Sequence, residues 1–370
     1  MKRIYILFLL LLTMALSAFS RLSVSLDGTA EKSSEIAVTD LLGRNIKLPE
    51  PAKKVVAIGP GALRLYVYAG NLDFVVGVEE MEKGDISGKP YMHANPDLAK
   101  LPTIGQGGPN NAPDPEKLIS VEPDVIFTTY ATDAASADEL QAKTGIPVVV
   151  ISYGGAGVTT IFGEKIQKSL TVIGEVTGDT TKADKANSFI KSMKEDLDNR
   201  TKDIDDAKKP SIYVGGLGSK GTHGIESTQG KYALLDIIHA KNVVDETGKS
   251  GSIMIDKEKL LEWDPDFLFI DQGGFSAVQE DYKKNPDFYN SLKAVKKEKV
   301  FSQLPYNYYS TNIDTAIADA FFLGKTIYPD AFKDVEPDKK ADEIYHALLG
   351  KALYSVMVEK FGGFGKISLK

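Results

Sequence analysis

The sequence predicts an α/β protein of two lobes, each with a mostly parallel sheet, joined by one long helix. Two observations predict this fold. Residues 114–127 return as residues 256–269, with seven of fourteen positions identical at a constant offset of 142. Solenoid repeats have periods of roughly 20 to 50 residues, so this offset fits two similar lobes of domain size. Short apolar runs also alternate with helical segments, which is typical of parallel sheets covered by helices.

Residues 1–20 have the composition of an export signal. Lys2 and Arg3 give a positive start, residues 4–12 are mostly apolar, and small residues lead up to Ser20. The apolar run is shorter than the about 20 residues of a membrane-spanning helix, although a retained membrane anchor is the alternative. We therefore expect export, cleavage near Ser20 and a soluble periplasmic product.

The composition narrows the function further. The chain has no cysteine, which excludes disulfides, thiolate metal sites and cysteine nucleophiles. It also excludes the lipidated cysteine that anchors many exported binding proteins, so no membrane anchor is expected. The formal net charge of −7, spread evenly, argues against a nucleic-acid partner. About 350 residues after processing exceed one ordinary core and suit two domains.

The first lobe is expected over residues 36–158, after a flexible tail over residues 21–35. Continuous apolar runs bounded by Gly and Pro predict its buried strands. The predicted strands are 55–58, 74–78, 125–129 and 148–151, and the predicted helices are 62–69, 115–121 and 134–144. Residues 79–113, rich in Gly, Pro and Asn, read as one long loop. Loops of that length are usually functional or disordered.

Residues 159–209 are expected to connect the lobes. Apolar residues keep helical spacing from 182 to 205 without Gly or Pro. A helix of about 24 residues would be roughly 36 Å long and would hold the lobes apart as a rigid connection. The alternative is one more crossover helix inside a larger sheet.

The second lobe is expected over residues 210–370 and repeats the order of the first. The predicted strands are 211–215, a strand beginning at Val243, and 267–270, and the predicted helices are 232–239, 315–327 and 338–361. A G-x-G-x-x-G motif follows the first of these strands. A dinucleotide site needs a helix directly after it, but helical composition resumes only near Lys231, so we do not assign one.

No catalytic constellation is evident. The motifs G-x-S-x-G and H-E-x-x-H are absent, and the four histidines His93, His223, His239 and His346 are scattered. The chain is therefore predicted not to be an enzyme, with an exported α/β enzyme as the alternative from another class. His93 and His223 fall in predicted loops, where an ordinary solvated side chain is the alternative to a ligand contact.

Candidate ligand contacts lie in loops at the carboxyl ends of the predicted strands, where open α/β sheets bind ligands. Arg64 follows the first strand-to-helix turn, where a guanidinium and a helix start favour an anion, although a surface salt bridge is the alternative. Residues 305–309 form the densest aromatic cluster, whose tyrosines offer hydrogen bonds or oxygens for ferric iron; a packed corner is the alternative. The candidate ligand-binding residues are Arg64, Tyr91, Gln106, Asn110, Tyr130, His223, Tyr306, Asn307 and Tyr308.

The order of elements, the long helix and the twin D-x-E-K-L-x-x-x-x-P-D-x-x-F motifs resemble the substrate-binding components of ABC importers for iron complexes, haem and cobalamin. The resemblance runs from about residue 36 to residue 361, and the glycines of residues 59–61 and 105–111 support it. It implies two Rossmann-like lobes bridged by one helix (the class III arrangement), a ligand in the cleft between them, and a monomer that delivers to a permease dimer with its ATPase subunits.

By position, the resemblance implies a docking role for Glu116 and Glu258, one in each copy of the motif. In relatives these glutamates meet arginines of the two permease subunits, and rim charges of this kind mainly set association rate and orientation. The alternative is that the motif repeats only because its apolar residues rebuild the same packing.

The resemblance leaves the ligand open. An iron(III) complex of the siderophore type is our first expectation, because tyrosines, Arg64 and amide-rich loops suit a bulky anionic complex with oxygen donors. Haem is next, with Tyr306, Tyr308 or His223 as a metal ligand, followed by cobalamin and oxyanions such as molybdate. No intrinsic cofactor is expected, and a bare divalent metal fits poorly because histidines and carboxylates are not clustered. A sensor or adhesin without a transporter is a further alternative.

Overall fold

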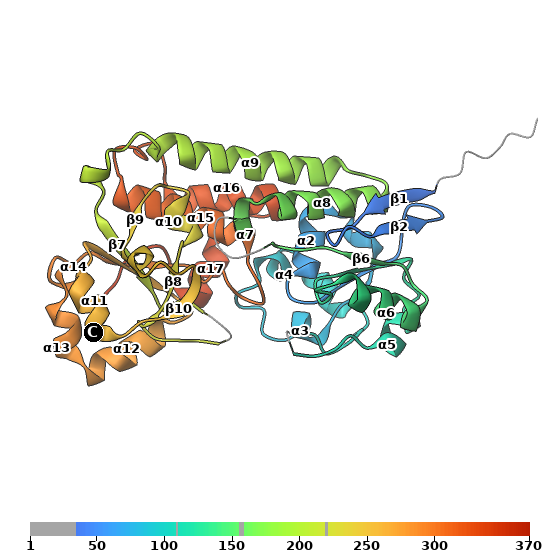
Figure 1. Cartoon of the computed structure of the whole chain (residues 1–370), viewed down its shortest axis with the longest axis horizontal. Coiled ribbons are helices and arrows are strands. Elements are labelled where there is room, and N and C mark those ends of the chain that lie inside the picture. Colours follow the sequence, from blue (N-terminus) through green and yellow to red (C-terminus); the bar gives the residue numbers. More distant parts are fainter. Residues whose placement is uncertain (1–34, 109, 155–158, 219–220) are drawn as a thin grey trace, which may run out of the picture. The chain divides into compact units, whose positions relative to one another are not determined.

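The computed structural model describes residues 35–108, 110–154, 159–218 and 221–370 (Figure 1). The predicted signal peptide and all but the last residue of the predicted tail lie outside these ranges. Within them, no helix combines the length and apolar character needed to cross a membrane.

The N-terminal lobe is built on a four-stranded parallel sheet in the order β4-β3-β5-β6. Its strands are β3 (Val55–Ile58), β4 (Val75–Gly77), β5 (Val125–Thr128) and β6 (Val148–Val150). Alternate residues of a strand point to opposite faces, and both faces are covered. Val56 and Ile58 pack with α5 (Pro115–Ser120) and α6 (Ala134–Thr144). The other face packs with α2 (Ala62–Ala69) and α8 (Glu164–Thr177).

The C-terminal lobe holds a five-stranded sheet in the order β13-β12-β11-β7-β9. Its strands are β7 (Ser211–Gly215), β9 (Lys241–Asn242), β11 (Phe267–Asp271), β12 (Val300–Gln303) and β13 (Gly365–Lys366). Only the edge strand β13 is antiparallel. Without it, the order β9-β7-β11-β12 repeats β4-β3-β5-β6, with the first strand between the second and the third. The predicted fold class is confirmed, while the exact lobe boundaries stay predictions.

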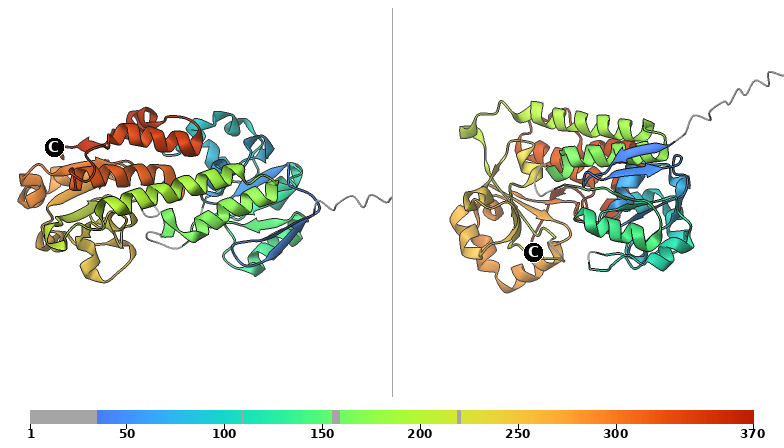
Figure 2. Two further views of the ribbon diagram at one scale, coloured as in Figure 1. Left: turned by 90° about the horizontal axis from the view of Figure 1, so that it is seen from above. Right: turned by 45° about the vertical axis from the view of Figure 1, so that its right-hand side comes forward.

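One helix connects the lobes and is fastened at both ends. In Figure 2, α9 (Thr181–Thr201) runs alongside α8, and it packs on α2 of the first lobe and on α15 (Ile313–Ile327) and α16 (Pro337–Leu349) of the second. Lys182 donates to the carbonyl of Gly70 at 2.9 Å. At the other end, Arg200 donates to both carboxylate oxygens of Asp334, at 2.7 and 2.8 Å. A fork of this kind fixes orientation as well as distance.

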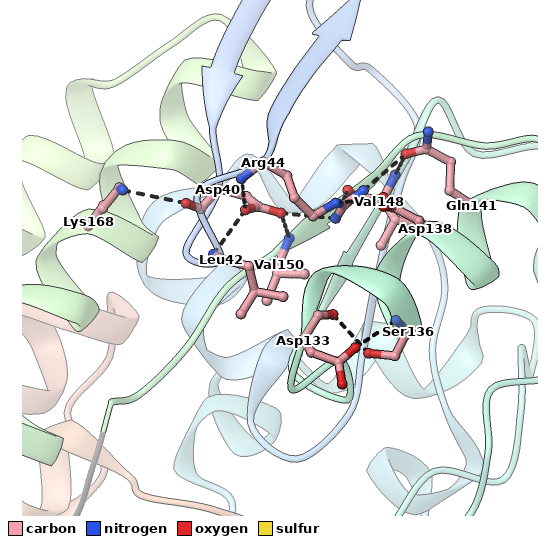
Figure 3. Close-up of polar contacts among 10 residues, drawn as sticks. All are labelled: Asp40, Leu42, Arg44, Asp133, Ser136, Asp138, Gln141, Val148, Val150 and Lys168. Carbon is pink, nitrogen blue, oxygen red and sulfur yellow. Dashed lines mark hydrogen bonds and ion pairs between the residues drawn. The ribbon is translucent and has the colours of Figure 1, made fainter.

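An N-terminal hairpin, β1 (Ile36–Thr39) and β2 (Asn45–Leu48), is pinned to the edge of the first sheet (Figure 3). The carboxylate of Asp40 accepts hydrogen bonds from the backbone of Leu42, Arg44 and Val150. The guanidinium of Arg44 pairs with Asp40 and also reaches Asp138 on α6 at 2.8 Å. These contacts close the edge of β6.

The remaining elements are mostly short. They include a separate antiparallel pair of strands in the C-terminal lobe, β8 (Ser227–Gly230) and β10 (Gly251–Met254). These elements are η1 (Leu72–Phe74), α3 (Glu80–Lys83), α4 (Pro90–Ala94), η2 (Pro96–Lys100), α7 (Thr159–Phe162), η3 (Asp206–Lys208), β8 (Ser227–Gly230), α10 (Ala233–Asp236), η4 (Val243–Thr247), β10 (Gly251–Met254), α11 (Lys257–Trp263), α12 (Phe275–Lys284), α13 (Pro286–Ser291), α14 (Lys293–Lys296) and α17 (Tyr354–Phe361).

Several predicted elements differ from the structure. The loop predicted over residues 79–113 contains α3, α4 and η2. The connecting helix has 21 residues rather than about 24, and the helix predicted over 338–361 breaks at Gly350, whose φ is 78°. The strand predicted at Val243 is a 3₁₀ turn, with the strand just before it, and α10 is shorter than predicted. In agreement with the sequence, no helix directly follows the G-x-G-x-x-G motif, since the next element is the strand β8.

Candidate ligand site at the strand ends

A buried carboxylate lies where three strands of the first sheet end. Glu79, 3% exposed, follows β4. Its Oε2 accepts a hydrogen bond from the amide of Gly59, after β3, at 2.9 Å, and its Oε1 accepts one from the hydroxyl of Tyr130, after β5, at 3.1 Å. These residues therefore meet at the carboxyl ends of neighbouring parallel strands, which is where open α/β sheets bind ligands.

The second lobe completes this cluster. Tyr309, between β12 and α15, donates its hydroxyl to Oε2 of Glu79 at 3.1 Å and accepts from the amide of Gly108 at 2.9 Å. The hydroxyl of Tyr130 lies 2.9 Å from the carbonyl oxygen of Gly108. Gly107 beside it has a φ of 72°, and a Cβ there would lie 2.9 Å from Cβ of Glu79. The loop therefore needs glycine to approach the carboxylate.

Burial raises the pKa of Glu79 to about 7, and nearby Glu82 adds to the rise, while bonds from Gly59 and the two tyrosines oppose it. Protonation also balances the hydrogen bonds. Tyr130 has one hydroxyl hydrogen but two acceptors within reach, Glu79 and Gly108. A protonated Oε1 would supply the missing donor. Burial raises the pKa of both Tyr130 and Tyr309, so both phenols hold their protons at neutral pH.

Arg64 holds the segment that carries Tyr309. Its side chain, on α2, is 0% exposed. Its guanidinium donates to the carbonyls of Tyr308 (2.7 Å), Tyr309 (3.1 Å) and Thr311 (3.1 Å) and to the hydroxyl of Tyr153 (3.3 Å). Three inward-facing carbonyls need such a donor because unpaired buried acceptors are costly.

The same segment is bent. Tyr309 and Ser310 have φ values of 51° and 74°, a left-handed conformation that costs non-glycine residues on the order of 1–3 kcal/mol each. Strain of this kind persists only where surrounding contacts hold it. The bonds from Arg64, a residue of the other lobe, are contacts of this type.

Three predicted ligand contacts lie behind the site rather than on it. Arg64 and Tyr91 are both 0% exposed, with the guanidinium 4.7 Å from the ring centre of Tyr91. Tyr306 is 6% exposed and packs on Tyr232, with ring centres 6.2 Å apart. In this structure none of the three is open to a ligand, because their polar or aromatic groups are already used in packing. Arg64 instead holds the carbonyls of the segment that carries Tyr309.

The other predicted contacts lie nearer the surface. Tyr308 is half-buried and its hydroxyl bonds Asp85 of the first lobe. Asn307 is exposed and donates to the carbonyl of Gly218 at 3.1 Å, in the glycine-rich loop after β7. Half-buried His223 follows in the same connection. Exposed Gln106 and Asn110 lie on the loop that carries Gly108. Among the predicted contacts, only Tyr130 belongs to the group that Glu79 forms with Tyr130, Tyr309 and Gly108. Contact with a ligand stays a prediction for each of these predicted residues.

The sequence interpretation missed Glu79 and Tyr309 as site residues. Both had a local signal. Glu79 directly follows an apolar strand, so its carboxylate had to lie at a strand end, and Tyr309 is the last tyrosine of the aromatic cluster. Neither signal shows that the two side chains meet.

The second lobe has its own buried carboxylate at a strand end. Asp271 closes β11, is 3% exposed and accepts from the amide of Gly273 at 2.8 Å. Burial raises its pKa to about 7. Asp319 of α15 is wholly buried nearby and accepts from the amide of Leu304 at 3.1 Å. Within the described ranges, no three His, Cys, Asp or Glu side chains are grouped to hold a metal.

The repeated motif occupies equivalent places in the two lobes, since α5 and α11 each lead into the third strand of their sheet. Most residues that are identical in the two copies of the motif make the same contacts in both lobes. Asp124 accepts from the backbone amides of Lys53 and Lys54, and Asp266 from that of Ser211, so each ties its strand to the start of the first strand. The repeated leucines and phenylalanines, Leu118, Leu260, Phe127 and Phe269, are all 0% exposed.

The repeated glutamates have no such task. Glu116 and Glu258 are exposed, and neither carboxylate has a hydrogen bond or ion pair with any residue that the structure describes. Packing therefore accounts for the leucines, the phenylalanines and the aspartates that follow proline, but not for the glutamates.

The chain has two mostly parallel sheets that share a four-stranded topology, a connecting helix, and a polar site to which both lobes contribute. These features define a two-lobed binding protein. The chain belongs to the periplasmic binding protein family, whose sequence profile matches residues 55–305.

Individual proteins resemble the chain over most of its length. It is 24% identical over 311 residues to an uncharacterized ABC transporter substrate-binding lipoprotein, YvrC, of Bacillus subtilis, covering 83% of this chain and 91% of that protein. It is 25% identical over 325 residues to the molybdate-binding protein MolA of Haemophilus influenzae, covering 83% and 89%. A crystal structure of a periplasmic solute-binding protein from Veillonella parvula superposes with a TM-score of 0.69 at 19% identity, covering 88% and 96%.

Proposed function

We propose that this protein is the substrate-binding component of an ABC importer and that it carries an iron(III) complex. Family membership and the curated relatives support the transport role. We further propose that residues 1–20 direct export and are removed, and that the chain works as a monomer without an intrinsic cofactor. The observation that carries the ligand class is the convergence of Glu79, Tyr130 and Tyr309 at the strand ends.

Three oxygen donors of this kind suit ferric iron. Carboxylate and phenolate oxygens are hard ligands, and hard cations prefer them to imidazole or thiolate. The phenols keep their protons at neutral pH in the empty protein, but a bound cation lowers the pKa of its ligands. Tyr130 and Tyr309 are each partly exposed. We infer that they bind a ferric complex whose chelator leaves coordination positions open, and that the two phenols release one proton each on binding, one to ionised Glu79 and the other to solvent.

An oxyanion is the second candidate, because the relative MolA is named as molybdate-binding. A protonated Glu79 and the amides of the glycine-rich loop would then donate to the anion. The two ligands respond to pH in opposite directions. Metal ligands must lose protons to bind, so iron affinity rises with pH. Oxyanion affinity falls as Glu79, whose pKa is about 7, ionises and repels the anion.

Docking is proposed for Glu116 and Glu258. They are the exposed, unpartnered carboxylates of the repeat, at equivalent places in two lobes of the same topology. Two such carboxylates fit a partner with two-fold symmetry. Arginines on two permease subunits are the partner that the family resemblance implies.

A ligand screen by thermal shift and fluorescence tests the proposed function. The panel holds ferric tris-catecholate and tris-hydroxamate complexes, a ferric tetradentate chelate, haemin, cobalamin, molybdate and divalent metals. A ligand present at a hundred times its Kd stabilises the folded state by about 2.7 kcal/mol. We expect a large shift with one ferric complex. A shift with molybdate alone would favour the second candidate, and no shift with any would contradict both.

A further inference from the structure

Large apolar side chains are exposed at only four places in the part of the chain that the structure describes. They are Met81 (40%), Ile119 (45%), Met254 (61%) and Leu261 (40%). A single exposed leucine on a protein surface needs no explanation. Two of these four, however, occupy equivalent positions of the repeat. Ile119 and Leu261 are separated by the same 142 residues as the two copies of the motif.

Each of these side chains lies beside a repeated glutamate. Ile119 is three residues after Glu116 on α5, and Leu261 is three residues after Glu258 on α11. Side chains three apart are neighbours on one face of a helix. In Figure 1, α5 and α11 lie one in each lobe. Each lobe therefore presents one free carboxylate and one apolar side chain together.

The buried side of each helix fixes which residues face outward. Leu118 and Leu260 are both 0% exposed and anchor the helices in the two lobe cores. The chain then takes a left-handed conformation at equivalent positions of the repeat, at Glu122 (φ of 47°), two residues after α5, and at Asp264 (φ of 37°), directly after α11. The same anchor and the equivalent bend place the two helices alike on their lobes. The residue after the anchor therefore points outward in both lobes.

The apolar character of this outward position is kept although its identity changes. Isoleucine stands there in one copy and leucine in the other, whereas the following position has Ser120 in one copy and Glu262 in the other. If this position only had to face solvent, a polar residue would serve there, as Ser120 and Glu262 do at the following position. Packing within the lobe accounts for only part of the side chain, because 45% of Ile119 and 40% of Leu261 stay exposed.

We propose that each lobe docks on the permease dimer through a two-residue contact, a glutamate and the apolar side chain three residues after it. Each permease subunit would present a basic side chain next to an apolar recess. This inference rests on the proposed function, because it adds to the docking role of Glu116 and Glu258. Because the glutamates are negatively charged, the partner surface should be basic. Because each lobe carries one such pair, the partner should have two-fold symmetry.

The two members of each pair have different tasks. A solvent-exposed ion pair contributes little to affinity, but it accelerates and orients association. A neighbouring apolar side chain that fills a recess excludes water, which is how small clusters of contacts come to dominate an interface. The glutamates should therefore govern the association rate and its salt dependence. Ile119 and Leu261 should govern the dissociation rate.

Binding kinetics to the permease–ATPase complex in lipid nanodiscs test this assignment. Three double variants are compared with the unaltered chain: Ile119→Ser with Leu261→Ser, Glu116→Gln with Glu258→Gln, and Ile119→Leu with Leu261→Ile as the matched control. We expect the serine pair to raise the dissociation rate at least tenfold at every salt concentration. The glutamine pair should slow association and flatten its salt dependence, and the control should bind like the unaltered chain.

Other outcomes separate this inference from the proposed function. If the unaltered chain binds the complex and the glutamine pair weakens binding, but the serine pair does not, the apolar contact is wrong and the docking glutamates stand. If the unaltered chain does not bind at all, the proposed function and this inference both fail. Melting temperature and ligand affinity should stay unchanged in all three variants, because the substituted side chains are exposed and none of them makes a hydrogen bond to Glu79.

Discussion

The hydroxyl of Tyr309 lies 3.1 Å from Oε2 of Glu79, and the two residues come from different lobes, 230 positions apart. The bond joins the end of β4 to the segment between β12 and α15. A ligand that binds at this bond meets both lobes at once. Only a ligand with different contacts in the open and closed forms can shift their balance, so this is a suitable place for one to act.

The raised pKa of Glu79 predicts a stability that falls with rising pH. Its folded pKa is about 7 against an ordinary 4.5, so the folded protein binds the proton more tightly. The stabilisation is complete below pH 4.5 and is lost as the pH rises through 7, by at most on the order of 3 kcal/mol. Urea denaturation between pH 5 and 8 should show this slope, and Glu79→Gln should reduce it.

A control separates this effect from the rest of the chain. Exposed Glu80, the next residue, should give the unaltered slope when replaced by glutamine. Asp271, whose pKa is also raised to about 7, should leave a residual slope in the Glu79→Gln variant. An unaltered slope in that variant would show that Glu79 ionises normally.

Replacing Tyr309 with phenylalanine should weaken binding of a ferric complex and reduce a visible tyrosinate-to-iron absorption band, leaving the part that Tyr130 contributes. It leaves the amide of Gly108 without its acceptor, at a cost of about 1–3 kcal/mol. Tyr308→Phe is the matched control, because its hydroxyl bonds Asp85 instead. If Tyr308→Phe reduces the band and Tyr309→Phe does not, the iron is bound by Tyr308, one of the three alternatives (with Tyr306 and His223) that the sequence left open as a metal ligand.

Arg64→Lys should destabilise the protein by about 1–3 kcal/mol for each buried carbonyl that it leaves without a donor. A lysine ammonium cannot reproduce the planar fork that holds the carbonyls of Tyr308, Tyr309 and Thr311. Amide exchange over residues 306–312 should accelerate more than elsewhere. Arg200→Lys, at a more exposed ion pair, should lower the free energy of unfolding by less. Equal losses of stability in the two variants would contradict the role given to Arg64.

Replacing Glu116 and Glu258 together with alanine should leave ligand affinity unchanged and lower uptake at least tenfold. Both carboxylates are exposed and make no bond among the described residues, so folding should not suffer. Replacing Glu139 and Glu280, one exposed glutamate in each lobe outside the repeat, is the control. Normal uptake by the first variant would contradict the docking role.

The sequence predicted local elements well where apolar runs and glycines coincide. β3, α2 and α6 have the predicted bounds because a buried strand or helix ends where glycine follows it. The strand predicted at Val243 was wrong because two valines fit a buried 3₁₀ turn as well as a strand. The motif repeat predicted two lobes of one topology, because its residues lead into the same strand in each.

The site could be predicted only in part. Arg64 was placed correctly after the first strand, but its burial depends on carbonyls some 244 positions away, which no local pattern encodes. The same holds for the bond between Glu79 and Tyr309. Tyr130, whose contact with a ligand stays a prediction, could be proposed because a strand end is a local feature, whereas the meeting of two lobes is not.

The most direct test of an iron complex held by both lobes is amide hydrogen exchange of the protein with and without the ferric chelate that stabilises it most in the screen. We predict protection at the loop around Gly108 and Tyr130 in the first lobe, together with residues 306–311 in the second. Protection confined to one lobe, or protection away from the strand ends, would contradict the account.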